Sequence, residues 1–104
     1  MKACVAFITA PTGAPARKLA NKIVAARLAA CVNIVPTVES IYWWEGKRQK
    51  DREALLIVKT RRTLISKLMF FVRKNHPYDV PEIIALDIKA GHRPYLSWLE
   101  QETR

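Results

Sequence analysis

The amino-acid sequence predicts an α+β fold of the ferredoxin-like type, a sandwich in which an antiparallel sheet carries two helices on one face. Segments typical of strands and segments with helical periodicity follow one another in the order β-α-β-β-α-β, and a short C-terminal helix ends the chain. A charged turn joins the second and third strands directly, as in a hairpin. The chain has 104 residues, half of them apolar, which predicts one domain over residues 1–104 with its own core.

The first half of the chain predicts a strand, a helix and a very long second strand. Residues Ala3–Thr9 are rich in β-branched and aromatic side chains, which favour strands. Residues Pro15–Ala30 place apolar side chains three and four positions apart, which is typical of an amphipathic helix. The long strand covers Val32–Trp44. Pro36 within it predicts an edge strand or a bulge, because proline cannot donate a hydrogen bond to the ladder.

The second half predicts a hairpin return, a second long helix, a fourth strand and a short last helix. The charged turn is expected at Gly46–Asp51 and the returning strand at Glu53–Thr60. A second helix is expected at Thr63–Asn75, with its first residue as the cap. The fourth strand is expected at Val80–Ile88 and the last helix at Pro94–Glu102.

Both faces of the predicted sheet are apolar, which predicts that the chain assembles with copies of itself. The third and fourth strands are apolar at consecutive positions over Ala54–Val58 and Ile83–Ile88, whereas a strand with one face in water should alternate. The long strand also ends in Tyr42, Trp43 and Trp44, which would overhang a small domain. One short terminal helix cannot cover so much surface, so another subunit is its simplest cover.

The charge of the chain is strongly basic, with a formal net charge of +9 from 18 Lys and Arg against 9 Asp and Glu. Such a balance can indicate a nucleic-acid or other anionic partner. The cations are scattered along the sequence over predicted helix faces and turns, which favours an ordinary solvated surface. Binding of nucleic acid is therefore not expected.

The cysteines and the apolar segments predict a cytoplasmic chain that does not enter a membrane. Cys4 and Cys31 form no CxxC pair and no zinc-ligand spacing, and two reduced thiols are typical of the cytosol. No apolar run reaches the length of a membrane-spanning helix. The residues after Met1 and Lys2 resemble a short signal peptide, but a strand accounts for them better, so a mature chain is expected.

Five segments spread over nearly the whole chain resemble the signatures of one family, in that family's order. They are RLAACVNIVP (Arg27–Pro36), SIYWWEGK (Ser40–Lys47), LLIVKT (Leu55–Thr60), NHPYDVPEIIAL (Asn75–Leu86) and YLSWL (Tyr95–Leu99). On these segments the chain resembles the CutA family, the divalent-cation-tolerance proteins. The resemblance implies a ferredoxin-like subunit in a tight homotrimer, related in shape to PII-type signalling trimers. It also implies binding of copper or other divalent metals and no established catalytic reaction.

The resemblance directs attention to a candidate metal site around His76. Imidazole suits copper, and the further candidate ligands are the Glu82 carboxylate and the Cys31 thiol. Some bacterial members carry a metal-associated Cys where this chain has Ile8 and a second His where it has Asn75, so Cu(II) or another divalent cation is expected to bind weakly. The alternative is that His76 bonds to the backbone and holds a turn, and that Glu82 pairs with a Lys or Arg.

The aromatic end of the long strand is a candidate cleft at a subunit interface. Successive side chains of a strand point to opposite faces, so Tyr42 and Trp44 are expected on one face and Trp43 on the other. In one interpretation these rings form the wall of a cleft that also contains Lys59, Tyr78 and Glu82 and could hold a small-molecule ligand, since binding pockets are mostly apolar with a few polar groups. In the other interpretation they are ordinary core residues.

No catalytic motif indicates an enzyme. The sequence contains no HExxH, GxSxG, phosphate-binding loop or dinucleotide fingerprint, and a Cys31–His76 pair would lack an orienting third group. The predicted function is that of a non-enzymatic trimer that takes part in divalent-cation tolerance and binds copper. The alternatives are a PII-like trimer that signals by binding a small ligand, and a basic protein that binds nucleic acid or other anions.

Overall fold

The computed structural model describes residues 1–104 and confirms the predicted order of strands and helices. One sheet contains all the strands in the order β2-β3-β1-β4, and each neighbouring pair is antiparallel. The elements are β1 (Ala3–Ala10), α1 (Ala14–Ala25), β2 (Cys31–Trp44), β3 (Lys47–Arg61), the short 3-10 helix η1 (Arg62–Leu64), α2 (Ile65–Asn75), β4 (Ile83–Asp87) and α3 (Arg93–Glu102). This is the ferredoxin-like topology that the sequence predicts.

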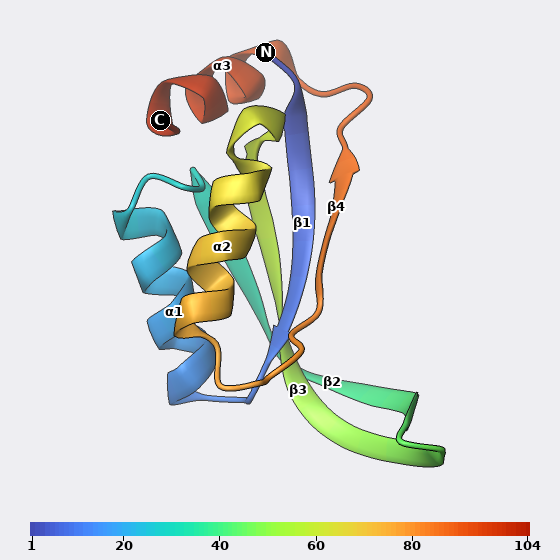
Figure 1. The fold of residues 1–104 in the computed structure, drawn as a ribbon. Helices are drawn as coiled ribbons and strands as arrows, with labels where there is room; N and C mark the ends of the chain where they lie inside the picture. Colours follow the sequence, from blue (N-terminus) through green and yellow to red (C-terminus); the bar gives the residue numbers. More distant parts are fainter.

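Helices α1 and α2 lie side by side on one face of the sheet, and the core fills the space between them and the strands (Figure 1). Alternate residues of the central strands β1 and β3 point toward the helices and are buried. The larger side chains that meet there are Ile8 of β1, Leu56 and Val58 of β3, Leu19 and Ile23 of α1, and Leu68 and Val72 of α2. Burial of each such side chain stabilises the fold by about 1.5–3 kcal/mol, so this helix-covered face is the stabilising core.

Strand β2 forms one edge of the sheet, and its pairing with β3 shifts between Val35 and Val38. Pro36 lies within this shift, where the ladder does not need the N–H that proline lacks. The prediction of an edge strand or a bulge at Pro36 is therefore confirmed on both counts. The shift also changes which residues share a face, because Val35 stands beside Leu55 whereas Val38 stands beside Glu53.

Beyond β1, strands β2 and β3 continue as a two-stranded ribbon, which we call the hairpin arm (residues 38–53). β1 pairs with β3 only from Ala54 to Arg61, so no third strand supports the arm, and Figure 1 shows it projecting from the body. The chain is accordingly elongated, with extents of 44 × 25 × 23 Å. The turn of the arm consists of Glu45 and Gly46, with φ of 50° and 75°, which is the left-handed backbone that a two-residue type I′ turn requires.

The third strand begins earlier than predicted, because its first residues form one side of the hairpin arm. The charged segment at Gly46–Asp51 was expected to be a turn, but β3 begins at Lys47 and has 15 residues. Its first residues, KRQKDR, are polar on both faces because both faces of the arm meet solvent in a single chain. A strand of this kind carries no alternation of apolar and polar residues, so its sequence does not differ from that of a turn.

Three other elements have a boundary that differs from the prediction by more than one residue. Helix α1 ends at Ala25, earlier than expected, because the backbone turns at Arg27 with a φ of 62°. Thr63 does not cap the second helix with its side chain, since it lies within η1, which leads directly into α2. Strand β4 covers only Ile83–Asp87, the part that pairs with β1, and so is shorter than the apolar run that predicted it.

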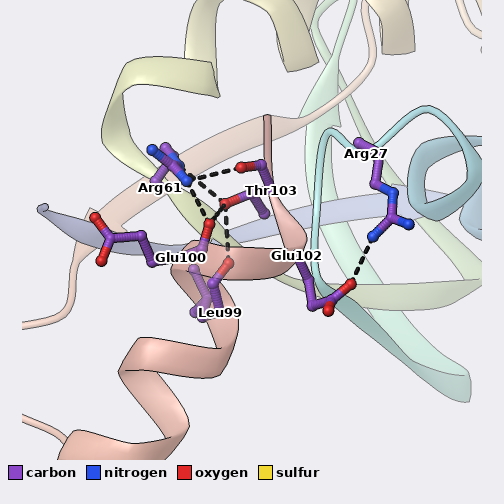
Figure 2. Close-up of polar contacts among 6 residues, drawn as sticks. All are labelled: Arg27, Arg61, Leu99, Glu100, Glu102 and Thr103. Carbon is purple, nitrogen blue, oxygen red and sulfur yellow. Dashed lines mark hydrogen bonds and ion pairs between the residues drawn. The ribbon is translucent and has the colours of Figure 1, made fainter.

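Helix α3 lies across one end of the sheet, near the start of β1, and Arg61 fixes its last turn (Figures 1 and 2). The Arg61 guanidinium donates to the Thr103 hydroxyl at 2.9 Å, to the Thr103 carbonyl at 2.7 Å and to the Glu100 carbonyl. Thr103 is almost fully buried at this contact. An ion pair between Arg27 and Glu102 ties the turn after α1 to the same helix end.

Candidate functional site

The sheet face opposite the helices, which we call the open face, is apolar although the chain covers little of it. On this face Phe7 of β1 lies between Ile57 of β3 and Ile84 of β4. Ile84 and its neighbour on the same face, Leu86, are 55% and 59% exposed. The prediction that both faces of the sheet are apolar is therefore confirmed, and the open face is the largest feature that the fold of one chain leaves unexplained.

The hairpin arm adds exposed aromatic side chains to this surface. Tyr42 pairs with Gln49 and Trp43 with Arg48, so successive rings point to opposite faces of the arm as predicted. Trp43 is 73% exposed and Trp44 is 48% exposed. The interpretation of these rings as ordinary core residues is wrong within a single chain, because the arm projects beyond the core.

Two tyrosine–carboxylate pairs lie at the base of the arm, on the side of the open face. The Tyr78 hydroxyl donates to Glu53 Oε1 at 3.1 Å, and the Tyr42 hydroxyl donates to Asp51. Burial, and then the Glu53 carboxylate, raise the pKa of Tyr78 to about 12. The hydrogen bond to Asp51 raises the pKa of Tyr42. Both phenols are therefore protonated at neutral pH and serve as hydrogen-bond donors, not as bases.

One chain assembles only part of the predicted cleft. The Asp51 and Glu53 carboxylates raise the pKa values of both Tyr42 and Tyr78, so these four side chains form one group. Lys59 is not part of this group, because it lies six positions beyond Glu53 on β3, which corresponds to about 20 Å along a strand. Lys59 instead stands beside Cys31 at the opposite end of the open face.

Sequence analysis did not identify Asp51 and Glu53 as residues of this cluster. Both were assigned to the turn or to the very start of the returning strand, so their side chains had no predicted direction. The signal that could have found them is parity, since they share the odd-numbered positions of β3 with Leu55 and Ile57 on the open face. Glu53 is only 8% exposed, which is unusual for a carboxylate and reflects its bond from Tyr78.

His76 is held on both sides of its ring by the backbone. Its Nε2 lies 2.7 Å from the carbonyl oxygen of Thr9, and its Nδ1 accepts a hydrogen bond of 3.1 Å from the N–H of Tyr78. A carbonyl oxygen only accepts, so Nε2 carries the proton and the ring is neutral in this arrangement. The side chain is 8% exposed and its ring centre lies 4.7 Å from that of Tyr78. This geometry matches the structural role that the sequence left open for His76.

The other candidate metal ligands do not gather around His76. Glu82 is exposed on the segment before β4. Cys31 pairs with Lys59 of β3, and Lys59 pairs in turn with Val5 of β1. His76 contacts Thr9, which lies four positions beyond Val5 on β1, a distance of about 13 Å along the strand. No group of three or more His, Cys, Asp and Glu side chains in the chain could hold a metal ion. The same separation keeps Cys31 and His76 from forming a nucleophile–base pair.

Ile8 and Asn75, the two positions that the family resemblance singled out, have structural roles here. Ile8 is fully buried on the helix-covered face of β1. The Asn75 amide donates to the Phe71 carbonyl at 2.8 Å and accepts from Lys22 Nζ at 3.2 Å. The residues of one chain therefore do not fit a preformed metal centre.

Cys31 belongs to a second polar group, at the far end of the open face. Lys59 Nζ lies 3.9 Å from Cys31 Sγ. Burial, and then Cys31, raise the pKa of the Tyr95 phenol, which shows that α3 brings this ring to the thiol. Sequence analysis did not connect Tyr95 with Cys31, because nothing in the sequence gives the direction in which the last helix crosses the sheet.

Two surface hollows contain no residue of either polar group, although His76 lines the second of them. One, of about 700 Å³, lies between the first residues of the chain, the segment after β4 and helix α3, and includes Lys2, Lys89 and Arg93. The other, of about 650 Å³, lies between α1 and the end of α2. Among the helices, none has both the length and the apolar character needed to cross a membrane.

Comparison with known proteins shows the family to which this fold belongs. Residues 4–102 match the family described as CutA1 divalent ion tolerance protein. The chain is 54% identical over 100 residues to Protein CutA 1, chloroplastic, from Oryza sativa, and the match covers 96% of this chain and 56% of the rice protein. The crystal structure of CutA1 from Oryza sativa has a TM-score of 0.97 at 52% identity and covers 100% of this chain and 95% of that one.

A bacterial relative matches over its full length. The divalent cation tolerance protein from Thermus thermophilus has a TM-score of 0.95 at 49% identity, and the alignment covers 98% of this chain and 99% of that one. By contrast, the chain spans only about half the length of the curated plant and mammalian relatives. The match over nearly all residues, in sequence and in structure, shows that the chain belongs to the CutA family of divalent-cation tolerance proteins.

Proposed function

We propose that the chain works as a non-enzymatic homotrimer in divalent-cation tolerance, and that its subunits pack through the open face and the hairpin arm. The observation that carries this proposal is the exposure of large apolar side chains on those two surfaces. They include Ile84 and Leu86 on the sheet and Ile41, Trp43 and Trp44 on the arm. A soluble protein rarely leaves so much contiguous apolar surface in water unless a partner covers it.

The arm gives an independent reason for assembly. A two-stranded ribbon is only marginally stable in water when nothing packs against it. Residues 38–53 of this chain form such a ribbon, with Ile41 and Trp43 64% and 73% exposed on one of its faces. Packing against a neighbouring subunit would supply the missing contact. Self-association follows from this surface, and the number of three copies follows from the family resemblance.

A non-enzymatic role fits the polar groups that the chain offers. The two phenols at the base of the arm stay protonated, and both ring nitrogens of His76 are engaged by the backbone. Cys31 stands beside an ammonium group and not beside a base. None of these arrangements joins a nucleophile to a general base that a third group orients, as nucleophilic catalysis requires.

Copper binding by one chain should be weak. A cation at His76 must displace either the bond to Thr9 or the bond from Tyr78, and the carboxylates closest to it in sequence, Asp79 and Glu82, are both exposed. No step of the proposed function therefore depends on a metal ion held by His76. A small ligand in the assembled cleft remains part of the proposal, and so does a cytoplasmic location, which the free thiols of Cys4 and Cys31 support.

The oligomeric state tests the proposal. Ile57→Glu places a charge on the open face, whereas Leu56 on the same strand points into the core and would report only on folding. We expect light scattering to give a trimer mass for the wild-type chain and a monomer, with a loss of folded structure, for Ile57→Glu, because a buried unpaired carboxylate is costly. Val24→Glu, on the exposed side of α1, is the matched control and should remain a trimer. A wild-type monomer at micromolar concentration, or a stable Ile57→Glu trimer, would refute the proposal.

A further inference from the structure

Positive charge is concentrated on the layer formed by α1 and α2, which we call the helical layer. These two helices carry six cations and neither an Asp nor a Glu. The six are Arg17, Lys18, Lys22, Lys67, Arg73 and Lys74, all exposed and none in an ion pair within the chain. The rest of the chain contains the other 12 of the 18 cations and all 9 carboxylates, so its net charge is only +3. The scatter of cations along the sequence is therefore misleading, because folding gathers most of the net charge on one face.

The helical layer also has a concave part. The hollow of about 650 Å³ lies between α1 and the end of α2, and Lys18, Lys22 and Lys74 line it. None of its ten lining residues is acidic. A hollow with low-dielectric walls and cations of one sign strengthens the local positive potential, which attracts anionic groups such as phosphates.

An aromatic ring lies exposed among these cations. Phe70 of α2 is 57% exposed, and Lys74 Nζ lies 4.6 Å from the centre of its ring. Proteins that bind single-stranded nucleic acid combine cations that follow the phosphate backbone with aromatic rings on which bases stack. Phe70 and the six cations offer that combination on one face.

We propose that the helical layer binds single-stranded nucleic acid, with its lysine and arginine side chains on the phosphates and Phe70 stacked on a base. A membrane surface would offer phosphates too, but a helix that lies in a membrane must present an apolar face to the lipid. Here the apolar faces of α1 and α2, which include Leu19, Ile23, Leu68 and Val72, are buried against the sheet. The helical layer is opposite the open face, so assembly through the open face leaves it free.

The experiment is a fluorescence-anisotropy titration of a labelled oligothymidine of about 20 nucleotides with the 104-residue chain. With about four phosphate contacts, raising NaCl from about 50 to about 200 mM should weaken binding about 50-fold. In the layer variant, Lys18→Gln/Lys67→Gln/Lys74→Gln, the slope of log affinity against log salt should fall by about 2. The matched control, Lys2→Gln/Lys89→Gln/Arg93→Gln, removes the same charge outside the helical layer and should keep the wild-type slope.

Phe70→Ala separates stacking from charge. We expect it to weaken binding about fivefold or more at each salt concentration, without changing the salt slope. The proposal is overturned if both triple variants lose affinity equally, because the binding would then depend on net charge alone. It is also overturned if Phe70→Ala binds like the wild type.

Titration with vesicles of phosphatidylserine and phosphatidylcholine is the third part of the experiment. Binding to vesicles without binding to the oligonucleotide would overturn the proposal in favour of a membrane.

Discussion

Arg61 and Arg62 are adjacent arginines in different environments, and their comparison measures how much the contact at the end of α3 contributes to stability. Arg61 makes three hydrogen bonds to Thr103 and Glu100, as Figure 2 shows. Arg62 makes one ion pair with Asp87 at 2.9 Å, and the two side chains are 56% and 50% exposed. The perturbation is Arg61→Met, which keeps the apolar stem and removes the guanidinium, with Arg62→Met as its matched control.

The expected losses of unfolding free energy differ because the two guanidinium groups differ in burial and in the number of hydrogen bonds that they donate. A hydrogen bond from a charged group contributes about 1.5–3 kcal/mol net, and removing Arg61 leaves the buried end of the chain without its donors. Arg61 is only partly buried, so water replaces some of these bonds, and we expect Arg61→Met to cost about 2–3 kcal/mol. An exposed ion pair contributes about 0–1 kcal/mol, so Arg62→Met should cost no more than that. Arg61→Lys should fall between them, because an ammonium group cannot make the forked contact.

The assay is urea unfolding followed by circular dichroism, with every variant at the same protein concentration because the proposed assembly would make stability depend on concentration. The expected order of stability is wild type and Arg62→Met together, then Arg61→Lys, then Arg61→Met. Equal losses for Arg61→Met and Arg62→Met would show that the contact in Figure 2 contributes no more than an ordinary surface pair. In that case the reasoning from burial and hydrogen-bond count is wrong.

Two further predictions concern the open face and His76. Burial and Glu53 raise the pKa of Tyr78 from 10.0 to about 12, so its contribution to stability is complete below pH 10 and is lost as the pH rises through 12. Tyr78→Phe should remove this alkaline dependence and cost about 1 kcal/mol at neutral pH after allowance for solvent screening. A wild-type curve of stability against pH that stays parallel to the Tyr78→Phe curve between pH 10 and pH 12 would contradict it. For His76, isothermal titration should show weak Cu(II) binding that falls on acidification, because metal ligands must be deprotonated, and that His76→Ala abolishes. Equal copper affinity in both proteins would leave His76 with its structural role alone.

The overall topology could be predicted because each main element leaves a pattern that depends on burial. The buried sides of α1 and α2 recur at helical spacing, and the consecutive apolar residues of β3 and β4 reveal a sheet with two apolar faces. Pro36 predicted the edge position of β2 because the loss of an N–H has a definite consequence in a ladder. The hairpin arm was predicted only in part, since the residues that β3 contributes to it, KRQKDR, are polar on both faces and their strand pairing depends on β2.

The candidate site was less predictable because its residues meet through tertiary packing. The sequence offers His76 as a ligand with the chemistry that copper prefers. The fold instead uses its Nε2 to join the end of α2 to Thr9 of β1, and its Nδ1 to accept the N–H of Tyr78 in the following turn. Whether a histidine binds a metal or the backbone depends on which atoms lie within about 3 Å, and no local pattern determines that. The pairing of Tyr78 with Glu53 likewise needs the segment after α2 to cross the open face.

The distribution of charge is consistent with assembly through the arm in spite of the net charge of +9. Like charges on neighbouring subunits repel, so a strongly basic chain assembles best through surfaces that are themselves neutral. The hairpin arm meets this condition. The arm has a net charge of zero, because it contains four cations and four carboxylates. The cations are Lys47, Arg48, Lys50 and Arg52, and the carboxylates are Glu39, Glu45, Asp51 and Glu53. Most of the excess charge lies on the helical layer, on the opposite side of the sheet, where it does not oppose packing of the open face. A trimer built in this way would present three basic layers at once, so even a weak phosphate contact on each chain would gain from the high effective concentration of the other two.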